Sequence, residues 1–360
     1  MSAGRGAHTL HEIRSQAEAW DGTLARIDRD AAELGALLAC AEEIIVAGCG
    51  SGFNVAYAVA PVLQRATGKS CRAAHASDLV IHPDSFLSRS HETLVMVYSR
   101  SGATTESVMA THAAQAAGHK VLAVVCYAAS PMATDADAVL VLAEAVEQSV
   151  TTTRSFTAMV LAGHYLAAVA ARDEVARRAM RELPALVAAR MADFEALGKQ
   201  ISEDPAIAKY AFLGSGARYG LAREAQLKVK EMVLLPADSY VSLDYRHGPM
   251  SNVDEGMLVT VLGSQAGQGY DADLIRDMKG LGGQVFALFN RSRAGAACAD
   301  YRLDLDVALG DDQGDVLYMP ALQFLATYKS LAVGCDPDHP RHLSHHVELT
   351  EGDGLQSRGE

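Results

Sequence analysis

Short runs of almost continuous hydrophobic residues alternate along the chain with longer stretches in which apolar residues recur at helical spacing. In the first half, helical periodicity over residues 9–40 is followed by hydrophobic runs at residues 44–46, 93–98, 120–127 and 138–144. Runs that are apolar on both faces predict strands of a parallel sheet, because crossover helices bury both faces of such a sheet. We therefore predict an α/β fold with helices on both faces of a parallel sheet.

The second half of the chain repeats this order of runs and turns. The repeating segments are residues 209–220, 257–267 and 282–290. Gly50 and Gly216, in the two glycine-rich turns, are 166 residues apart, and Val121 and Val285 are 164 residues apart. Two offsets that agree this closely indicate an internal duplication.

A chain of 360 residues has room for two domains of ordinary size. We expect a helical segment at residues 1–40, a first domain at 41–190, a second domain at 191–335 and an irregular tail at 336–360. The join between the domains is expected in the arginine- and alanine-rich region around residues 172–200.

The composition is that of a globular protein, with 49% hydrophobic and 21% charged residues. The net charge of −13 argues against a nucleic-acid-binding protein, which needs a basic face, but not against small anions held by backbone N–H groups. The six cysteines form no C-x-x-C pair, the first ten residues lack the apolar segment of a secretory leader, and no apolar run is long enough to span a membrane. We expect a cytoplasmic protein with free thiols and with no nucleic-acid or membrane partner.

The segment SRSGATTE, residues 99–106, lies where a predicted strand ends and a predicted helix begins. Ligands of open α/β sheets bind at this edge, and the unpaired N–H groups of a helix N-terminus favour a phosphate. Ser99, Ser101 and Thr104 add hydroxyl donors, and Gly102 lets the backbone approach a ligand closely. An ordinary serine or threonine cap explains the same pattern, so the residues alone leave both interpretations open.

Two further segments carry small and hydroxyl residues before predicted helices. The turn GCGSG, residues 48–52, has Val55 where a dinucleotide-binding fingerprint has its third glycine, so we expect it to approach a sugar or a phosphate instead. The segment TTTRSFTA, residues 151–158, places Arg154 among hydroxyl residues. This arginine suits an anion, but a threonine-rich helix cap is an equal alternative.

Glu224, Lys228 and Glu231 fall within a stripe about 60° wide on a predicted helix, beside an apolar face. Solvated ion pairs at three- and four-residue spacing are the common explanation of such a stripe. If the stripe faces a pocket instead, a carboxylate flanked by a cation is a plausible proton carrier.

Two histidine-containing segments are candidates for chemistry. His247, in the loop DYRHGPMS, could act as an acid or base near neutral pH, although a histidine that only hydrogen-bonds its loop is commoner. The tail places His342, His345 and His346 at metal-ligand spacing, but the cluster contains no carboxylate or cysteine at such spacing. We predict no metal site.

Taken in order, these motifs resemble the sugar isomerase (SIS) domain family. The first half contributes GCGSG, SRSGATTE and EQSVTTTRSFT, the second half contributes LGSG, REAQLKVKE and LDYRHGP, and the tail PDHPRHLSHHVELT resembles the family's C-terminal tail. The resemblance implies two tandem SIS domains, each a flavodoxin-like parallel sheet with helices on both faces. The chain is similar to the isomerase half of glucosamine-6-phosphate synthase and to stand-alone deaminases and isomerases of amino-sugar phosphates.

The resemblance also implies roles for individual residues. It assigns phosphate binding to Ser99, Ser101 and Thr104. The residues expected to line the sugar are Gly50, Ser51, Gly52, Val150 and Thr152. Glu231 would move a proton between C1 and C2, and Lys228 and Glu224 would hold the open-chain sugar. His247 would open the ring from the neighbouring subunit, which implies a homodimer or a larger assembly.

Two of the expected substrate-binding residues depart from the synthase pattern. Arg100 stands where the synthase has glutamine, and His345 stands where it has a lysine that forms a Schiff base with the sugar. His345 could still act as an acid or base, but it cannot form that imine.

We therefore expect an enzyme that converts a hexosamine 6-phosphate, such as glucosamine 6-phosphate, into fructose 6-phosphate and ammonia. No metal or redox cofactor is expected, because the carbonyl or imine next to C2 already acidifies its proton. The alternatives are a simple aldose–ketose isomerase, a fructosamine-6-phosphate deglycase and a non-catalytic phosphosugar sensor.

Overall fold

The computed structural model describes residues 4–88, 90–291 and 297–349, which contain two five-stranded parallel sheets. The strands of the first sheet are β1 (Glu43–Gly48), β2 (Ser70–His75), β3 (Thr93–Ser99), β4 (Lys120–Val125) and β5 (Ala138–Val141). The strands of the second sheet are β6 (Lys209–Gly214), β7 (Ala237–Val241), β8 (Met257–Leu262), β9 (Gln284–Phe289) and β10 (Tyr301–Asp304).

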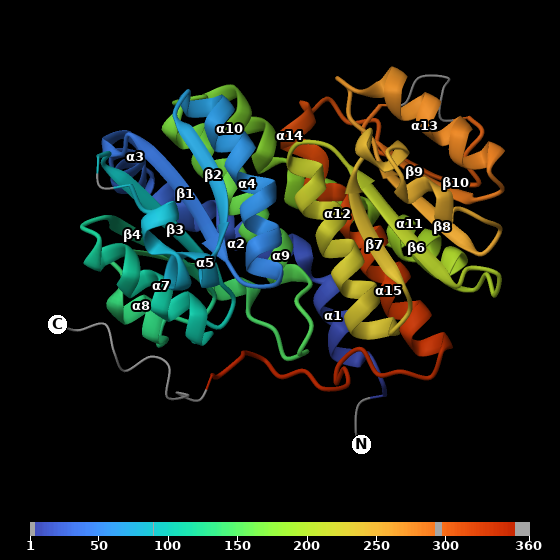
Figure 1. Ribbon diagram of the computed structural model, residues 1–360, viewed down its shortest axis with the longest axis horizontal. Coiled ribbons are helices and arrows are strands. Elements are labelled where there is room, and N and C mark those ends of the chain that lie inside the picture. Colours follow the sequence, from blue (N-terminus) through green and yellow to red (C-terminus); the bar gives the residue numbers. More distant parts are fainter. Residues whose placement is uncertain (1–3, 89, 292–296, 350–360) are drawn as a thin grey trace.

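Both sheets have the same strand order. The first sheet runs β2-β1-β3-β4-β5, and the second runs β7-β6-β8-β9-β10 in the same sense. This is the flavodoxin-like order, in which the chain changes direction across the sheet beside its first strand. The predicted fold of two parallel sheets with helices on both faces is confirmed, and the two halves lie side by side (Figure 1).

Three strands that the hydrophobic pattern did not predict lie at sheet edges. They are β2, β7 and β10. Each edge strand pairs on one side only, and these three carry exposed or partly exposed polar residues among the apolar ones. These three edge strands therefore have no continuous apolar run to reveal them in the sequence, whereas the edge strand β5 has one.

One hydrophobic core is shared by the two halves and lies between the sheets. Alternate residues of β1 show the division, because Ile44 and Val46 face this central core and Ile45 faces the outer side of the sheet. The helices that fill the space between the sheets pack against one another across the two halves. They are α4 (Ser51–Thr67), α9 (Arg154–Ala170), α12 (Ala217–Lys228) and α15 (Met319–Ala332).

The remaining helices pack beside these four, cover the outer faces of the sheets or lie at the ends of the sheets. On the first half they are α1 (Ala7–Arg14), α2 (Gln16–Arg29), α3 (Ala31–Cys40), α5 (Ala76–Ile81), α6 (Pro83–Phe86), α7 (Thr105–Ala116), α8 (Pro131–Asp135), η1 (Ala143–Ala145) and α10 (Glu174–Arg181). On the second half they are α11 (Leu183–Ser202), η2 (Val229–Val233), η3 (Asp244–Arg246), η4 (Pro249–Asn252), α13 (Gln268–Gly280), α14 (Asp311–Gly314) and η6 (Asp315–Tyr318). Among the described residues no helix is both long and apolar enough to cross a membrane.

Helix α11 runs through the boundary expected at residues 190 and 191. It packs against α15 of the second half and against α2 of the N-terminal segment. One helix thus contacts both parts of the chain at the place where the sequence suggests a linker.

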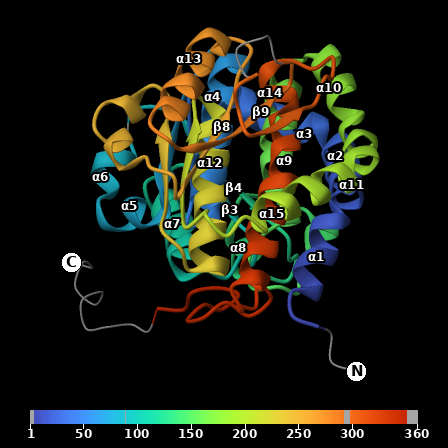
Figure 2. The same ribbon diagram turned by 90° about the vertical axis from the view of Figure 1, so that its right-hand side faces the viewer.

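The last described residues form an irregular segment that returns to the first half. The carboxylate of Asp338 accepts hydrogen bonds from the backbone and hydroxyl of Thr9, at 2.8 and 2.7 Å, so the end of the chain is fastened to α1. From there the segment passes across one end of the molecule towards α7 (Figure 1, Figure 2). We call residues 343–349 the tail strap, because Leu349 donates its backbone N–H to Thr105 at the start of α7, at 3.1 Å.

Candidate active site

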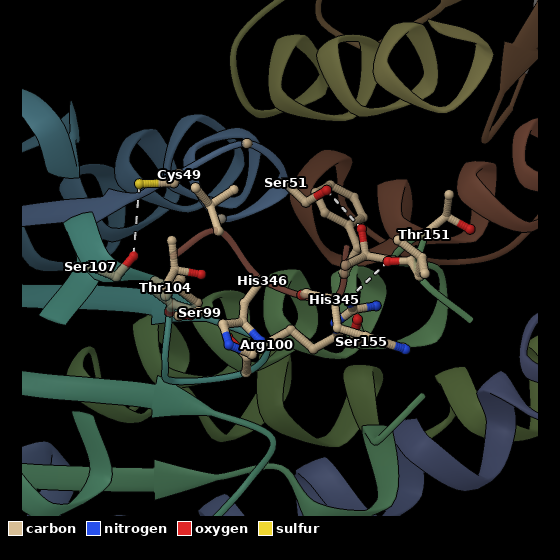
Figure 3. A pocket seen from close by; sticks show the side chains of 18 of the residues that line it. Cys49, Ser51, Ser99, Arg100, Thr104, Ser107, Thr151, Ser155, His345 and His346 are labelled. Atoms are coloured by element: carbon tan, nitrogen blue, oxygen red, sulfur yellow. Dashed lines mark hydrogen bonds between the residues drawn. The ribbon is translucent and has the colours of Figure 1, made fainter. Parts of the chain in front are cut away.

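A cavity of about 200 Å³ lies at the carboxyl ends of β1 and β3, in the first half of the chain. It is bounded by the start of α4, the turn between β3 and α7, the loop before α9, Glu231 of η2 and the tail strap. In the view of Figure 3, Ser99 and Thr104 lie on one side of the cavity, Ser51 and Thr151 on the other, and His345 and His346 between them. The predicted residues that line it are Gly50, Ser51, Gly52, Ser99, Arg100, Ser101, Thr104, Val150, Thr152, Glu231 and His345.

The glycine-rich turn after β1 brings bare backbone to the cavity. Gly50 has a φ of +52°, in the left-handed region that glycine enters without strain. A Cβ at Gly52 would collide with the carbonyl oxygen of Tyr98 on the neighbouring strand β3. The chain therefore needs glycine at both positions to place the start of α4 against β3.

The turn between β3 and α7, residues 100–104, is braced by two of its own hydroxyls. The Oγ of Ser99 accepts a hydrogen bond from the backbone N–H of Gly102 at 3.2 Å, and the Oγ of Ser101 accepts one from Ala103 at 3.1 Å. Thr104 precedes the first residue of α7, but its side chain makes no capping hydrogen bond. The interpretation of these residues as ordinary helix caps therefore fails for Thr104, whose side chain faces the cavity instead.

Arg100 lines the cavity but uses its guanidinium for contacts within the protein. Its two terminal nitrogens donate to Glu147 Oε2 at 3.3 Å and to the carbonyls of Ser149, Val150 and His345 at 3.2, 2.9 and 3.0 Å. The side chain is only 8% exposed. Arg100 thus ties three segments together: the turn after β3, the loop before α9 and the tail strap.

The loop before α9 is built on two buried carboxylates that sequence reasoning missed. Glu147 accepts the backbone N–H and the hydroxyl of Thr153, at 2.7 and 2.8 Å, and the backbone N–H of Ser155 at 3.2 Å. Glu12, from α1, accepts the N–H and the hydroxyl of Ser149. Burial, and then the nearby charge of Glu147, raise the pKa of Glu12. Acidic residues that bond this many donors hold the loop in one shape.

Arg154 does not take part in the cavity, although its position among hydroxyl residues made it a candidate anion ligand. Its guanidinium donates to the carbonyl of Val146 and, at 2.7 Å, to the hydroxyl of Ser15. The arginine therefore joins the loop to the N-terminal helices and is not among the residues that line the cavity.

Helix α12 brings the predicted stripe of charged residues into the protein interior. The side chains of Glu224 and Lys228 are 0% and 1% exposed, so the interpretation of the stripe as solvated ion pairs is wrong. The Nζ of Lys228 lies 3.2 Å from Glu224 Oε1 and 2.6 Å from Glu231 Oε2. Burial by itself lowers the pKa of Lys228, but the charges of Glu224 and Glu231 outweigh burial and raise it above its ordinary value.

Glu224 and Lys228 connect this cluster to the first half of the chain. Glu224 accepts hydrogen bonds from Ser51 Oγ at 2.9 Å, Asn54 Nδ2 at 2.9 Å and Thr152 Oγ1 at 3.2 Å. Lys228 also donates to Thr152 Oγ1 at 3.2 Å. The two residues lie behind the cavity wall, where they hold Ser51 and Thr152 in place.

Glu231 lies in a π-helical turn, where a regular helix was predicted. The N–H of Leu234 bonds to the carbonyl of Val229, five residues earlier, and the hydroxyl of Ser330 bonds to the carbonyl of Met232 at 2.7 Å. Such turns insert one residue into a helix and are frequent at functional sites. Glu231 is the member of the cluster that lines the cavity, with a side chain 21% exposed.

The two candidate histidines have different positions. His247 is exposed, between η3 and η4, and does not line the cavity of its own chain. His345, in the tail strap, lines the cavity, and burial followed by the charge of Arg100 lowers its pKa. His346 pairs with Glu348. Within the described part of the chain, no group of three or more histidine, cysteine or acidic side chains is placed to hold a metal ion.

The model of the SIS domain family matches residues 37–169 and 208–304, which covers both sheets. The chain belongs to the SIS domain family. This membership confirms the predicted resemblance and agrees with the duplicated topology.

Individual relatives show which activities occur among similar proteins. A protein of Streptomyces coelicolor, provisionally named D-galactosamine-6-phosphate deaminase AgaS, is 31% identical over 92% of this chain and 91% of its own length. A glutamine–fructose-6-phosphate aminotransferase (isomerizing) of Pyrobaculum aerophilum is 29% identical over 94% of this chain, which spans only 57% of that protein. The crystal structure of tagatose-6-phosphate ketose/aldose isomerase from Escherichia coli superposes with a TM-score of 0.84 at 28% identity, over 92% of this chain and 95% of that one. The chain is thus an enzyme of the phosphosugar isomerase family.

Proposed function

We propose that this enzyme converts a hexosamine 6-phosphate into a ketose 6-phosphate and ammonia. The observation that carries the proposal is that the carboxylate of Glu231 and the serine-rich turn after β3 line one cavity. A cavity of about 200 Å³ is smaller than the 300–1,000 Å³ typical of drug-sized ligands and suits a monosaccharide phosphate. The relatives named as deaminase and isomerase support the same reaction class.

The phosphate would bind at residues 99–104, beside the N-terminus of α7. The hydroxyls of Ser101 and Thr104 face the cavity there, and the positive end of the helix dipole favours an anion. Binding energy gained at the phosphate would then position the reacting carbons against Glu231.

In the chemical step, the Glu231 carboxylate removes the proton from C2 of the open-chain 2-amino aldose. The electron pair forms the C1–C2 double bond of an enolamine, and the carbonyl oxygen of C1 takes a proton from solvent. The same carboxyl group returns its proton to C1 and the amino nitrogen loses a proton to solvent, which gives a C1 hydroxyl and an imine at C2. Water adds to this imine and ammonia leaves, so one substrate molecule and one water yield one ketose 6-phosphate and one ammonia. Lys228, at 2.6 Å from Glu231, holds the carboxylate in position.

The decisive experiment follows ammonia and ketose 6-phosphate from glucosamine 6-phosphate and from its C4 epimer, galactosamine 6-phosphate. Glu231→Gln should abolish turnover and still bind phosphosugar, whereas the matched change Glu255→Gln, at an exposed site, should leave turnover intact. Full activity of Glu231→Gln would refute the assignment. Ser101→Ala combined with Thr104→Ala should raise KM; an unchanged KM would place the phosphate elsewhere.

A simple aldose–ketose isomerase is the second candidate, because the superposed Escherichia coli structure is named as one. It would convert a hexose 6-phosphate without release of ammonia. Amino-acid release from a fructosamine 6-phosphate would indicate a deglycase, and phosphosugar binding without any product would indicate a sensor.

We also propose that the working unit is a homodimer in which His247 serves the cavity of the neighbouring chain. His247 is exposed and is not part of its own chain's cavity, so an inward role needs a second copy. The test mixes Glu231→Gln chains with His247→Ala chains after mild dissociation. Mixed dimers contain one complete site each, so about one quarter of the wild-type activity should return. No recovery in verified mixed dimers would contradict a shared site.

A further inference from the structure

The second half of the chain contains a turn that duplicates the proposed phosphate turn. Residues 263–267 connect β8 to α13, and residues 100–104 connect β3 to α7, at the same place in the strand order and with the same length. Helix α13 has 13 residues, so its N-terminus carries the usual unpaired N–H groups and positive dipole end.

In this second turn the N–H groups are already bound to an anion supplied by the chain. The carboxylate of Asp311 accepts the backbone N–H of Gln265 at 2.7 Å and that of Ala266 at 3.1 Å. Arg218 donates to the same carboxylate at 2.9 Å and to the carbonyl of Asp311. Two backbone donors and a guanidinium around one carboxylate form the kind of site that binds phosphate.

Arg218 is buried in the protein beside this turn. It is the second residue of α12, after a turn whose Gly216 has a φ of +60°, comparable to the +52° of Gly50 before α4. The equivalent residue of α4 is Gly52, which has no side chain. Arg218 is 3% exposed, and its Nε has no hydrogen-bond partner among the described residues. A buried guanidinium is costly without an anion, and Asp311, together with the nearby Asp315, supplies that negative charge to Arg218.

The first half differs at the corresponding loop. Glu147 follows β5 as Asp311 follows β10, but Glu147 bonds Thr153 of its own loop, Ser155 in the first turn of α9 and the side chain of Arg100. Among the described residues, no carboxylate accepts a hydrogen bond from the backbone N–H groups of residues 100–104. The first turn therefore stays open to the cavity, whereas the second is filled.

We infer that the turn at residues 263–267 is a second anion site, and that Asp311 occupies it in place of a phosphate. The inference rests on the proposed function in one respect, namely that the first turn binds a phosphate. Because Asp311 is attached to the chain, its effective concentration at the turn is high, and a free phosphate cannot displace it. A chain with two equivalent sheets would then hold one phosphosugar and not two.

Two acidic neighbours limit how tightly the opened site can bind. Asp271 Oδ2 accepts the N–H of Ser264 in the same turn, at 3.1 Å, and the buried Asp315 has no hydrogen-bond partner among the described residues. Their charges repel an incoming phosphate, so binding in the millimolar range is expected once Asp311 is removed.

The test compares the thermal unfolding of Asp311→Ala, the wild type and Asp273→Ala in inorganic phosphate and in chloride of equal ionic strength. Asp273, exposed on α13, pairs with Arg276, so its replacement changes the net charge equally without touching the turn. At about 50 mM phosphate, the Tm of Asp311→Ala should rise at least about 2 °C more than that of either other protein. An equal response of all three proteins would overturn the inference.

Further variants keep the result decisive. Asp311→Asn fills the same space without the charge and should show no phosphate response, while Asp311→Ser opens the site with a different side chain and should respond like Asp311→Ala. If a variant unfolds in chloride, phosphate should restore its folding, and failure of phosphate to do so also counts against the inference. The rise in Tm of Asp311→Ala caused by phosphate should persist when Ser101→Ala and Thr104→Ala are added, because those two residues belong to the first turn. The experiment measures only thermal unfolding. The result therefore holds or fails independently of whether the enzyme has the proposed activity.

Discussion

Replacement of Lys228 with methionine removes a buried cation and leaves two carboxylates without it. Glu224 is fully buried and would keep three hydrogen bonds, from Ser51, Asn54 and Thr152, but no counter-charge. Loss of one partner from a buried ion pair costs about 3–5 kcal/mol, against about 0–1 kcal/mol for an exposed pair. Because the hydrogen bonds remain, we expect the free energy of unfolding to fall by about 3 kcal/mol.

Urea denaturation followed by circular dichroism measures this loss. The matched control is Arg276→Met, which breaks an exposed pair of the same three-residue spacing as Lys228–Glu231 and should cost less than about 0.5 kcal/mol. The double variant Lys228→Met with Glu224→Gln removes both charges, so its cost should be smaller than the sum of the single costs by about 1–3 kcal/mol. A Lys228→Met cost equal to that of the surface control, or strictly additive costs, would refute the buried network.

The contribution of Lys228 to the stability of the folded protein depends on pH, and the pKa of Lys228 fixes the sign of that dependence. The pKa of Lys228 is raised in the folded protein above its ordinary value of 10.5. The stabilisation by the ammonium is therefore fully present below pH 10.5 and is lost as the pH rises through the folded pKa. Wild-type protein should lose this contribution only above pH 10.5, and Lys228→Met should lack the loss.

Two other changes test the wall of the cavity and the second turn. Arg100→Ala removes four hydrogen bonds to Glu147, Ser149, Val150 and His345, so the tail strap should be cleaved faster in limited proteolysis and KM should rise roughly tenfold; a cleavage rate equal to that of Arg276→Ala would contradict this. Burial raises the pKa of Asp271 to about 6, so this group lowers stability as the pH rises from about 4 to 6. Asp271→Asn should remove that decline, worth on the order of 3 kcal/mol, and an unchanged profile from pH 4 to 7 would count against it.

The fold could be predicted from the sequence because its strands are buried on both faces. Seven strands stood out as apolar runs, and the agreement between Gly50–Gly216 and Val121–Val285 identified the duplication. The edge strands β2, β7 and β10 could not be found in this way, since burial on part of their surface leaves mixed polarity. Their positions follow only from pairing with a neighbour in the sheet.

Residues of the candidate site could be predicted where they lie in a turn directly after a predicted strand, because the strand fixes their position in the fold. The glycine turn and the turn at 100–104 lie next to strands that the pattern located, so their residues could be expected at one sheet edge. Glu12 carries no motif, because its hydrogen-bond partners lie in the distant loop before α9. Glu147 begins the segment EQSVTTTRSFT, but that segment by itself gave the carboxylate no role.

The sequence by itself determined the two parallel sheets, their duplication and the residue types offered at the strand ends, because hydrophobic periodicity and turn chemistry are local properties. Only the tertiary structure decided that the Glu224–Lys228–Glu231 stripe is buried against the first half. It also decided that the guanidinium of Arg100 bonds the loop before α9 and the tail strap, and that Asp311 occupies the second turn. Each of these depends on contacts between residues far apart in the chain. Whether a charge faces water, a ligand or another charge is settled by the packing of whole elements, which no local pattern encodes.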